Sequence, residues 1–441
     1  LDQIAAQGVH FRSAYTACPV CIPARRTLMT GRKPSSHGVL MNYHTMLEGP
    51  TLPGELSKAG YQTHLVGKLH LWPMRKLYGF DSARWADAPH SSHPPNDYQR
   101  WLARQGVTIP EAGIAHGMSV NGYPVRPYHL DERFHFTNWC ASEAVDFLET
   151  RDPTLPFFLK VSFHQPHQPL TPPRCYYDRY MGMDLPEPWV ADWARIYEEP
   201  QRGLPVDAWR FWPPEREMKQ YRAAYWGCIN HIDNQIGRIM RKLPRNTIIV
   251  FTSDHGEMLG DHQWIRKRSP YEGSAHIPML MRFPGGMGLE QGVAPEEPVE
   301  LMDIMPTLLE AAGADVPDTV DGSSLLSLLR GEDGWRDYLH GECAAVPTLN
   351  SGQQYLTDGK VKYAWFPGMG QEQFFDLQHD PHEMEDLAGA PSRADEVALW
   401  RSRLVQELEG RPEGFVRDGA LQKLEGQTPL CLPGYERERW Q

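Results

Sequence analysis

The sequence predicts an α/β protein with a mostly parallel sheet flanked by helices and a small C-terminal α+β subdomain. Three apolar, strand-like segments at 60–67, 155–163 and 247–253 alternate with stretches of helical periodicity. The clearest helix repeats apolar residues at spacings of three and four: Tyr225, Ile229, Ile232, Ile236, Ile239 and Leu243. Past residue 330 a hairpin pattern turning at Asp358-Gly359 replaces this alternation. We therefore place a larger α/β domain at 1–335 and a C-terminal subdomain at 336–441.

The remaining elements follow in chain order. Residues 1–8 are typical of the last turns of a helix capped by Gly8, and 141–149 have a helical pattern. Segments 73–136 and 173–218 are rich in Pro and aromatic residues with little periodicity, so we expect loops that decide substrate choice. The subdomain is predicted as a hairpin at 354–365, a strand at 374–377 and a helix at 393–409.

Composition excludes several classes of protein. The 441 residues are 41% hydrophobic and 23% charged, as in ordinary globular proteins, and the net charge of −12 argues against nucleic-acid binding. No apolar run reaches the roughly 20 residues of a membrane span. The seven cysteines are too scattered for a disulfide framework. The compartment stays open, with a periplasmic or secreted location favoured over a cytoplasmic one.

The segment around Cys21 is the first candidate reactive site. Pro23 suits the first position of a short helix that Gly31 ends, which would put Cys21 just outside the helix N-terminus. Free N–H groups and the helix dipole favour an anion there. Cys18 and Cys21 also form a C-x-x-C, which could be a redox pair or half a zinc site. No second Cys or His pair stands at suitable spacing, so we expect Cys18 to be a small buried hydrophobe.

Other candidate residues follow the predicted strands. In parallel sheets, ligands gather beyond the carboxyl ends of the strands, where these residues would converge. Lys68 and His70 would point the same way if their segment is extended. Each candidate also has an interpretation without function. The Lys-x-His pair could simply be exposed at the surface, and His167 could belong to an ordinary Pro-rich loop. Asp254 could cap a turn, and Arg266 to Arg268 could be a solvated basic run. His231 is expected to be packed or at the surface. The candidates are Lys68, His70, His167, Asp254, His255 and Lys267.

Together these motifs resemble the sulfatase family of the alkaline-phosphatase-like superfamily. Cys21-Ile22-Pro23-Ala24-Arg25 has the form Cys-x-Pro-x-Arg and continues into Arg26-Thr27-Leu28-Met29-Thr30-Gly31-Arg32. The other matches are Gly67-Lys68-x-His70, Pro166-His167-x-Pro169, Asp254-His255, and Lys267 ahead of Tyr271-Glu272-Gly273-Ser274. His276 stands where the family commonly has Arg, and His164 matches no part of the pattern.

The resemblance implies an alkaline-phosphatase-like fold and a cofactor set. A maturation enzyme would convert Cys21 to formylglycine. Asp254, His255 and the modified Cys21 would bind a divalent metal, with Ca²⁺ favoured and Mg²⁺ or Mn²⁺ as alternatives, although His255 offers nitrogen rather than oxygen. Lys267 would bind sulfate.

The implied activity is hydrolysis of a small-molecule or carbohydrate sulfate ester. The cationic set of Arg25, Lys68, His70, His167 and Lys267 fits sulfuryl or phosphoryl transfer. A formylglycine hydroxyl would attack sulfur, His70 would take the proton of the other hydroxyl, and His167 or Lys267 would serve the leaving oxygen. The rivals are a phosphonate or phosphate ester hydrolase and a catalytically dead binding protein, and the intact set of candidates argues against the second.

The family also places a first strand and a pair of metal-binding aspartates ahead of the helix that begins here at Leu1. We therefore expect an N-terminally incomplete sequence that alone binds metal poorly, aggregates readily and shows little activity.

Overall fold

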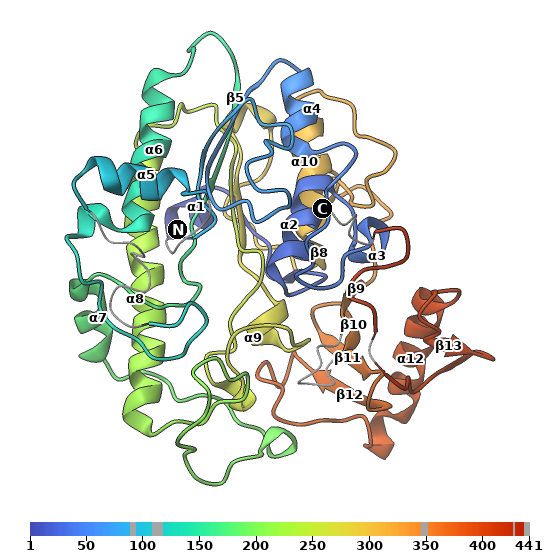
Figure 1. The fold of residues 1–441 in the computed structure, drawn as a ribbon. Helices are drawn as coiled ribbons and strands as arrows, with labels where there is room; N and C mark the ends of the chain where they lie inside the picture. The colour runs from blue at the N-terminus through green and yellow to red at the C-terminus, as the bar shows by residue number, and fades with distance from the viewer. Residues whose placement is uncertain (89–93, 108–117, 345–351, 427, 436–441) are drawn as a thin grey trace.

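The computed structural model describes residues 1–88, 94–107, 118–344, 352–426 and 428–435. Strands run between two layers of helices: α6 (Phe136–Thr150) and α8 (Glu215–Met240) lie on one side, and α2 (Cys21–Thr30), α4 (Leu52–Lys58) and α10 (Ile304–Ala311) lie on the other (Figure 1). A smaller antiparallel sheet adjoins this body near α9 (Glu272–Ala275). The predicted α/β class with a small C-terminal sheet is confirmed.

The main sheet consists of two hydrogen-bonded halves. In the first half, β3 (Gln62–Gly67) lies between β4 (Ser82–Trp85) and β5 (Phe157–Ser162), and both pairings are parallel. In the second, β7 (Met279–Arg282) pairs antiparallel with both β6 (Ile249–Thr252) and β1 (Val9–His10). The reversal between β6 and β7 occurs because the connecting segment has no long crossover helix of the kind that parallel pairing needs. A short parallel pair, β2 (Ala14–Tyr15) with β8 (Val299–Glu300), adjoins them.

Strands β5 and β6 line one large cavity of about 1210 Å³. Each lies at the edge of its half-sheet, and no hydrogen-bonded pairing between the two halves occurs among the described residues. The predicted apolar face of α8 forms one wall, and Leu28 and Leu308 contribute to the opposite wall. The carboxyl-end residues of β5 and β6 open into the same space, so the cavity reaches the candidate site.

Helix boundaries differ in detail from the predictions. α1 (Asp2–Ala6) ends at Gln7, and Gly8 is required by packing, because a Cβ there would lie 2.1 Å from the Met281 carbonyl oxygen. Cys21 is the first residue of α2, not the residue before it, because the extended Val20 is the N-cap. Gly31 ends α2 as predicted, in the left-handed conformation with φ of 64°.

The two segments predicted to be irregular contain regular elements. Segment 73–136 includes β4, α5 (Asp97–Arg104) and a 3₁₀ turn at Glu132–Phe134, with 108–117 outside the described residues. Segment 173–218 includes α7 (Arg174–Met181), a turn at Asp192–Ala194 and the start of α8, which extends N-terminally beyond its predicted apolar face. These elements were missed because eight-residue helices are too short for a clear apolar period.

The C-terminal elements follow the prediction closely. β9 (Leu339–Cys343), β10 (Gln353–Thr357), β11 (Val361–Phe366) and β12 (Gln371–Asp376) form an antiparallel sheet in the order β12-β11-β10-β9. Helix α12 (Ala394–Leu408) covers it through an apolar cluster that includes Trp400. The hairpin turns at Gly359, with φ of 84°, and Thr357 pairs with Lys362. The smaller elements are α3 (Pro34–His37), α11 (Leu325–Leu329), β13 (Val416–Arg417) and β14 (Ala420–Leu421).

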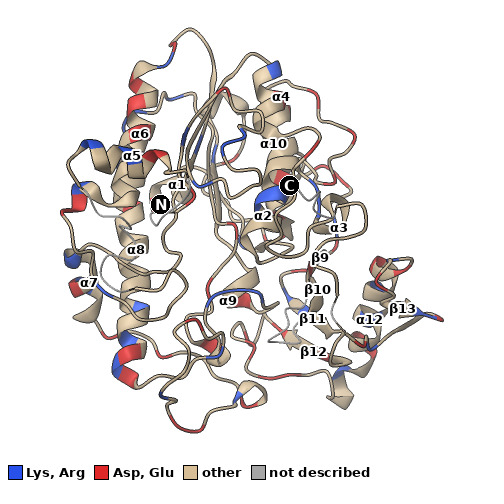
Figure 2. Ribbon diagram, in the orientation of Figure 1, with Lys and Arg blue, Asp and Glu red and all other residues tan. Residues whose placement is uncertain are grey.

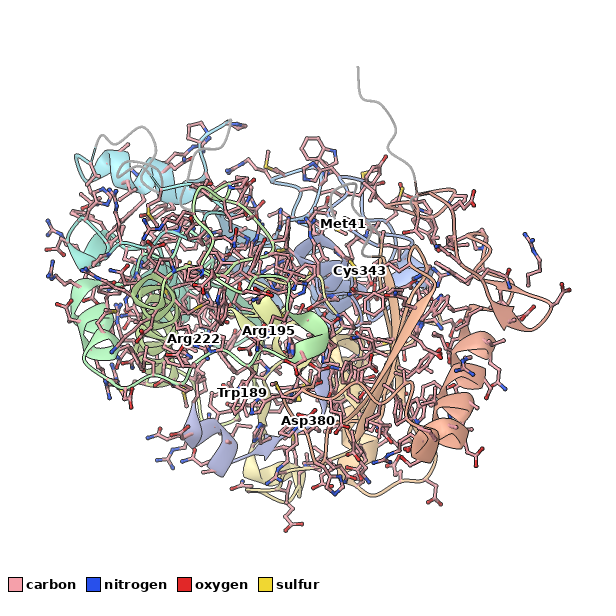
Figure 3. All side chains as sticks on the ribbon, turned by 90° about the horizontal axis from the view of Figure 1, so that it is seen from below. Met41, Trp189, Arg195, Arg222, Cys343 and Asp380 are labelled. Atoms are coloured by element: carbon pink, nitrogen blue, oxygen red, sulfur yellow. The ribbon has the colours of Figure 1, made fainter. Side chains whose placement is uncertain are left out.

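The 173–218 segment contacts the turn that follows β12, the last strand of the C-terminal sheet. Trp189 stacks on His382 with ring centroids 4.1 Å apart, and Trp193 Nε1 donates to the Glu383 carbonyl at 2.9 Å. In the view from below, Trp189 and Asp380 lie near one another (Figure 3). Two regions far apart in sequence therefore meet next to α9.

Charged residues of both signs are interspersed over the outer helices (Figure 2). The negative net charge is thus distributed over the surface. The candidate anion-binding residues Arg25, Lys68 and Lys267 are instead buried. No helix among the described residues is both long and apolar enough to cross a membrane. No disulfide bond joins cysteines in the described part of the chain.

Candidate active site

Cys21 lies where the two half-sheets and α2 meet. Its side chain is buried at the first position of α2, and Asn42 Oδ1 accepts a hydrogen bond from the next backbone N–H, that of Ile22, at 3.0 Å. The Sγ atom is 3.1 Å from His255 Nε2 and 4.0 Å from Lys68 Nζ. The thiol thus faces two basic groups from the ends of β3 and β6.

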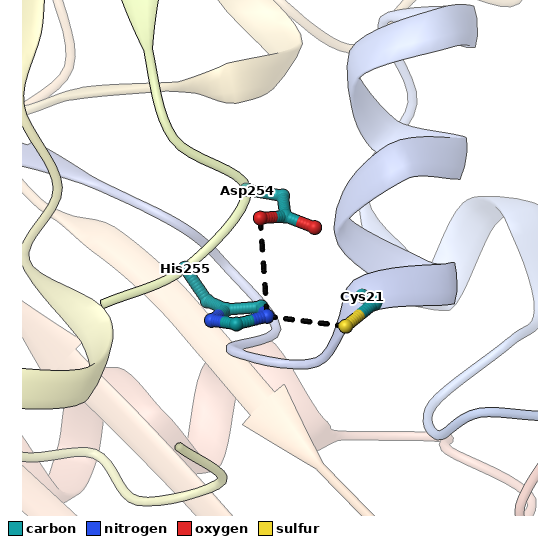
Figure 4. Close-up of side chains that lie close together, drawn as sticks. All are labelled: Cys21, Asp254 and His255. Atoms are coloured by element: carbon teal, nitrogen blue, oxygen red, sulfur yellow. Dashed lines mark hydrogen bonds and ion pairs between the residues drawn. The ribbon is translucent and has the colours of Figure 1, made fainter. Parts of the chain in front are cut away.

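Asp254, His255 and Cys21 could hold a cation together (Figure 4). One ligand atom from each lies within 4.8 Å of the other two. His255 Nδ1 is 2.9 Å from the Gly256 carbonyl, so its N–H donates there and the lone pair of Nε2 faces Cys21 and, at 3.8 Å, Asp254 Oδ1. A carboxylate, an imidazole nitrogen and an oxygen in place of Sγ would suit a hard divalent cation as part of its shell.

Arg25 joins the ends of three strands. Its Nε donates to Asp254 Oδ2 at 2.8 Å, and its guanidinium also donates to the Lys68 carbonyl at 3.1 Å and to Ser162 Oγ at 3.0 Å. Burial raises the pKa of Asp254, but Arg25 and His255 outweigh burial, so the pKa lies well below its usual range. Asp254 is therefore a fixed anion. Ser162 was not predicted, because nothing but its position at the end of β5 marks it.

Lys68 reaches the site because of a glycine. Gly67 has φ of 89°, and a Cβ on it would lie 2.2 Å from the Ser162 carbonyl oxygen, to which Lys68 N also donates at 2.9 Å. The chain can turn after β3 only with glycine there. Burial lowers the pKa of Lys68, which packs beside Cys21 and Arg25.

His70 differs from the expectation. Its φ of 55° ends the extended conformation, so the argument that Lys68 and His70 point the same way is wrong. The backbone N–H groups of Leu69 and His70 both donate to Asp87 Oδ1, at 2.9 and 2.8 Å, which fixes this turn. Among the described residues no hydrogen bond joins His70 to Cys21, and the buried Nδ1 of His70 has no hydrogen-bond partner.

His167 lines the same cavity as Lys68 and His255, the two residues that face Cys21. Its Nδ1 is 2.7 Å from the Gln168 carbonyl, so that nitrogen carries the proton. Burial and nearby Lys267 lower the pKa of His167 to about 3, which makes the ring neutral. His164 lies beside it, with ring centroids 4.9 Å apart, and contacts backbone carbonyls.

Lys267 is buried, so the alternative of a solvated basic run is wrong for it. It lines the same cavity as Lys68, His167 and His255. Burial raises the pKa of Cys21, but Lys267, Lys68 and His255, in that order, outweigh burial and lower the pKa well below the usual thiol range. The pocket therefore stabilises negative charge at this position.

The remaining predicted histidines and cysteines have structural surroundings. Cys18 packs in an apolar cluster with Cys343, and its Sγ lies 3.6 Å from the Leu40 carbonyl. No group that includes Cys18 could hold a metal among the described residues, which excludes the zinc alternative there. His231 is buried and lies 2.5 Å from Asn138 Oδ1. His276 stacks on Tyr15 and contacts Glu272 at 2.9 Å.

Comparison with known proteins matches this geometry. Residues 1–314 match the sulfatase family, and residues 260–410 match the N-sulphoglucosamine sulphohydrolase C-terminal family. The chain belongs to the sulfatase family. It is 40% identical to an arylsulfatase of Clostridium perfringens, over 96% of this chain and 92% of that protein. It is therefore a sulfuric ester hydrolase of alkaline-phosphatase-like fold.

Two further relatives belong to the same superfamily. The multifunctional alkaline phosphatase superfamily protein PehA of Trinickia caryophylli is 30% identical, over 94% of this sulfatase and 92% of PehA. The crystal structure of the phosphonate monoester hydrolase of Agrobacterium radiobacter superposes with a TM-score of 0.76 at 25% identity, over 92% of this chain and 89% of that one.

Proposed function

We propose that this sulfatase uses formylglycine made from Cys21 by a maturation enzyme, together with a divalent metal held by Asp254, His255 and the modified Cys21. Ca²⁺ is the cation we propose. The charged Asp254 and the lone pair of His255 Nε2, which faces Cys21, are suitable ligands for the cation. They supply part of the roughly six to eight ligands that Ca²⁺ takes. When bound, the cation would offset charge on the sulfuryl oxygens, and the hydrated aldehyde would offer one hydroxyl for attack and another for release of sulfate.

The chain's own cations bind and orient the sulfate ester in this proposal. Lys68, which follows β3, has its Nζ 4.0 Å from Cys21 Sγ, and Lys267, in the loop between β6 and β7, lines the same cavity. In this proposal each would contact a sulfuryl oxygen. Arg25 is a positioning residue, because all three of its hydrogen bonds go to protein groups. The site is therefore cationic before substrate arrives.

Three residues, His167, Lys267 and His70, are candidates for the proton-transfer steps. His167 is neutral, and its Nδ1–H donates a hydrogen bond to the Gln168 carbonyl oxygen. Its Nε2 therefore carries no proton and can accept but not donate one. This favours Lys267 over His167 as the group that polarises the leaving oxygen. The role of His70 as the base for sulfate release stays a prediction and requires its ring within hydrogen-bond reach of the modified residue.

One observation carries the proposal: a buried cysteine at the start of a helix has its Sγ 3.1 Å from His255 Nε2 and 4.0 Å from Lys68 Nζ, which follow β6 and β3. We expect mass spectrometry of protein co-expressed with a formylglycine-generating enzyme to show an aldehyde in the Cys21 peptide and an unchanged thiol in Cys18. The Cys21→Ala variant should lose the aldehyde and the sulfatase activity. Active protein containing only unmodified Cys21 would overturn the mechanism.

The substrate class we propose is an aryl or carbohydrate sulfate ester, supported by the arylsulfatase relative. A phosphonate ester hydrolase is the second candidate, because the phosphonate monoester hydrolase superposes well at 25% identity. Paired assays with phenyl sulfate and a phenyl phosphonate ester separate the two. We expect the higher kcat/KM for the sulfate ester.

A further inference from the structure

Three consecutive cations, Arg266, Lys267 and Arg268, are divided between two sides of the chain. Arg266 and Arg268 have φ of 67° and 78°, a left-handed conformation that is uncommon for residues other than glycine. Lys267 lines the catalytic cavity. Both arginines instead contact the Trp209 ring, with guanidinium carbons 3.6 Å and 4.2 Å from its centroid. Trp209 belongs to the 173–218 segment, so this segment meets the sulfate-binding loop here.

The two arginines differ in how their hydrogen bonds are satisfied. The Arg266 guanidinium is buried and donates to the Asp207 carbonyl, and its backbone N–H donates to Glu257. The Arg268 guanidinium contacts Trp209 but makes no hydrogen bond or ion pair with any described residue. The Nε atoms of both arginines are buried without a partner, so the two differ only at their terminal nitrogens. The terminal nitrogens of Arg268 therefore have no acceptor among the described residues and are available to an external anion.

Arg268 also lies close to the reactive centre. Its backbone N–H donates to the carbonyl of Pro19 at 3.2 Å, two residues before Cys21. This hydrogen bond joins the loop that carries Lys267 to the loop that carries Cys21. The guanidinium thus stands beside the sulfate-binding loop but is not one of the groups that contact Cys21.

We propose that Arg268, held against Trp209, binds a second anionic group of the substrate, a carboxylate or a second sulfate next to the ester that is hydrolysed. This inference rests on the proposed sulfatase mechanism and names the substrate class more narrowly. A guanidinium forms paired, charge-assisted hydrogen bonds to both groups, whereas a neutral aryl or sugar ring offers it no such acceptor. The preferred ester then carries two negative charges.

The test compares matched substrates with and without the second charge. Phenyl sulfate is paired with the three carboxyphenyl sulfates, and glucosamine 6-sulfate with glucosamine 2-N,6-O-disulfate. We expect Arg268→Met to lose about 10- to 100-fold more kcat/KM on the best doubly charged substrate than on its singly charged partner, the range for a charge-assisted pair. Arg268→Lys should recover part of this difference.

Arg266→Met is the matched control, because it removes a neighbouring charge from the same tryptophan. Its loss should be the same on both members of each pair. Equal losses for Arg268→Met within every pair, or a wild-type enzyme that favours the singly charged partners, would overturn the inference while leaving the sulfatase mechanism standing. Failure of the wild-type protein on every sulfate ester would instead overturn the proposed function and this inference with it.

Discussion

Lys362 is a buried cation that connects the C-terminal sheet to the catalytic part of the chain. Its Nζ donates to Glu272 Oε1 at 2.6 Å and to Glu383 Oε1 at 2.8 Å, and its side chain is 0% exposed. Glu272 lies in α9, five residues after Lys267, and its backbone N–H donates to Glu383 Oε2 at 2.8 Å. We expect Lys362→Met to destabilise the protein strongly.

The expected loss in the free energy of unfolding follows from the hydrogen-bond donors that Glu272 and Glu383 keep when Lys362 is removed. Glu272 keeps His276 Nδ1 at 2.9 Å, so it remains paired. Among the residues that the structure describes, Glu383, whose side chain is 2% exposed, keeps only the Glu272 N–H as a donor. One uncompensated buried carboxylate costs about 3–5 kcal/mol, and we expect a loss of this size in the free energy of unfolding. Lys58→Met, which removes a lysine that is 72% exposed, should cost about 0–1 kcal/mol and is the control.

The effect should depend on pH with a definite sign. Burial raises the pKa of Glu383 above its usual range, although Lys362 lowers it, and removing Lys362 raises it further. A carboxyl with a raised folded-state pKa contributes stability that is present below its unfolded pKa of about 4.5 and lost as pH rises through the folded value. Urea unfolding should therefore show a larger loss for Lys362→Met at pH 8 than at pH 5. A loss below about 1 kcal/mol at both pH values, or an equal loss at both, would refute the reasoning.

Three other predictions concern the site. Lys267→Ala should lower kcat/KM by about 10²- to 10³-fold, as for one oxyanion donor, and an equal effect of Arg266→Ala in steady-state assays would contradict a specific role for the lysine. Cys21→Ser should lose turnover and accumulate a covalent sulfate ester visible by intact-protein mass spectrometry, and normal turnover would contradict the release step. Gly67→Ala should destabilise the protein more than Gly60→Ala in urea unfolding. Both glycines have φ of 89°, but a Cβ meets the Ser162 backbone only at Gly67 and nothing within 4 Å at Gly60.

The strands and their terminal motifs could be predicted because the signals are local. Short apolar, β-branched runs ended by charged residues mark β3, β5 and β6, and the carboxyl-end rule then brings Lys68, His167 and Asp254 together. The hairpin at Gly359 was equally accessible, because a turn dipeptide needs no distant partner.

The features of the site that could not be predicted depend on single backbone dihedral angles and on residues far away in the sequence. The positive φ of His70 turns its side chain away from the direction that an extended chain would give it. The positive φ of Arg266 and Arg268 likewise directs these side chains away from Lys267. Ser162 and Asp87 bind the site from segments that carry no motif, and their roles follow only once the chain is folded. Periodicity reports which face of an element is buried, so it says nothing of such contacts.

The division of the chain at 335/336 stays a prediction, but contacts across it bear on how the site is held. The Tyr355 hydroxyl donates to the Thr16 carbonyl at 2.7 Å, and Glu342 N donates to the Ala17 carbonyl at 2.7 Å, so β10 and β9 both bind the segment that leads to Cys21. Lys362 binds the other side of the site through α9. Because the cysteine loop and the Lys267 loop are each attached to the same small sheet, that sheet fixes their separation. The small sheet can thus set the distance between the proposed nucleophile, Cys21, and the proposed sulfate-binding residue, Lys267, on which positioning of the ester would depend.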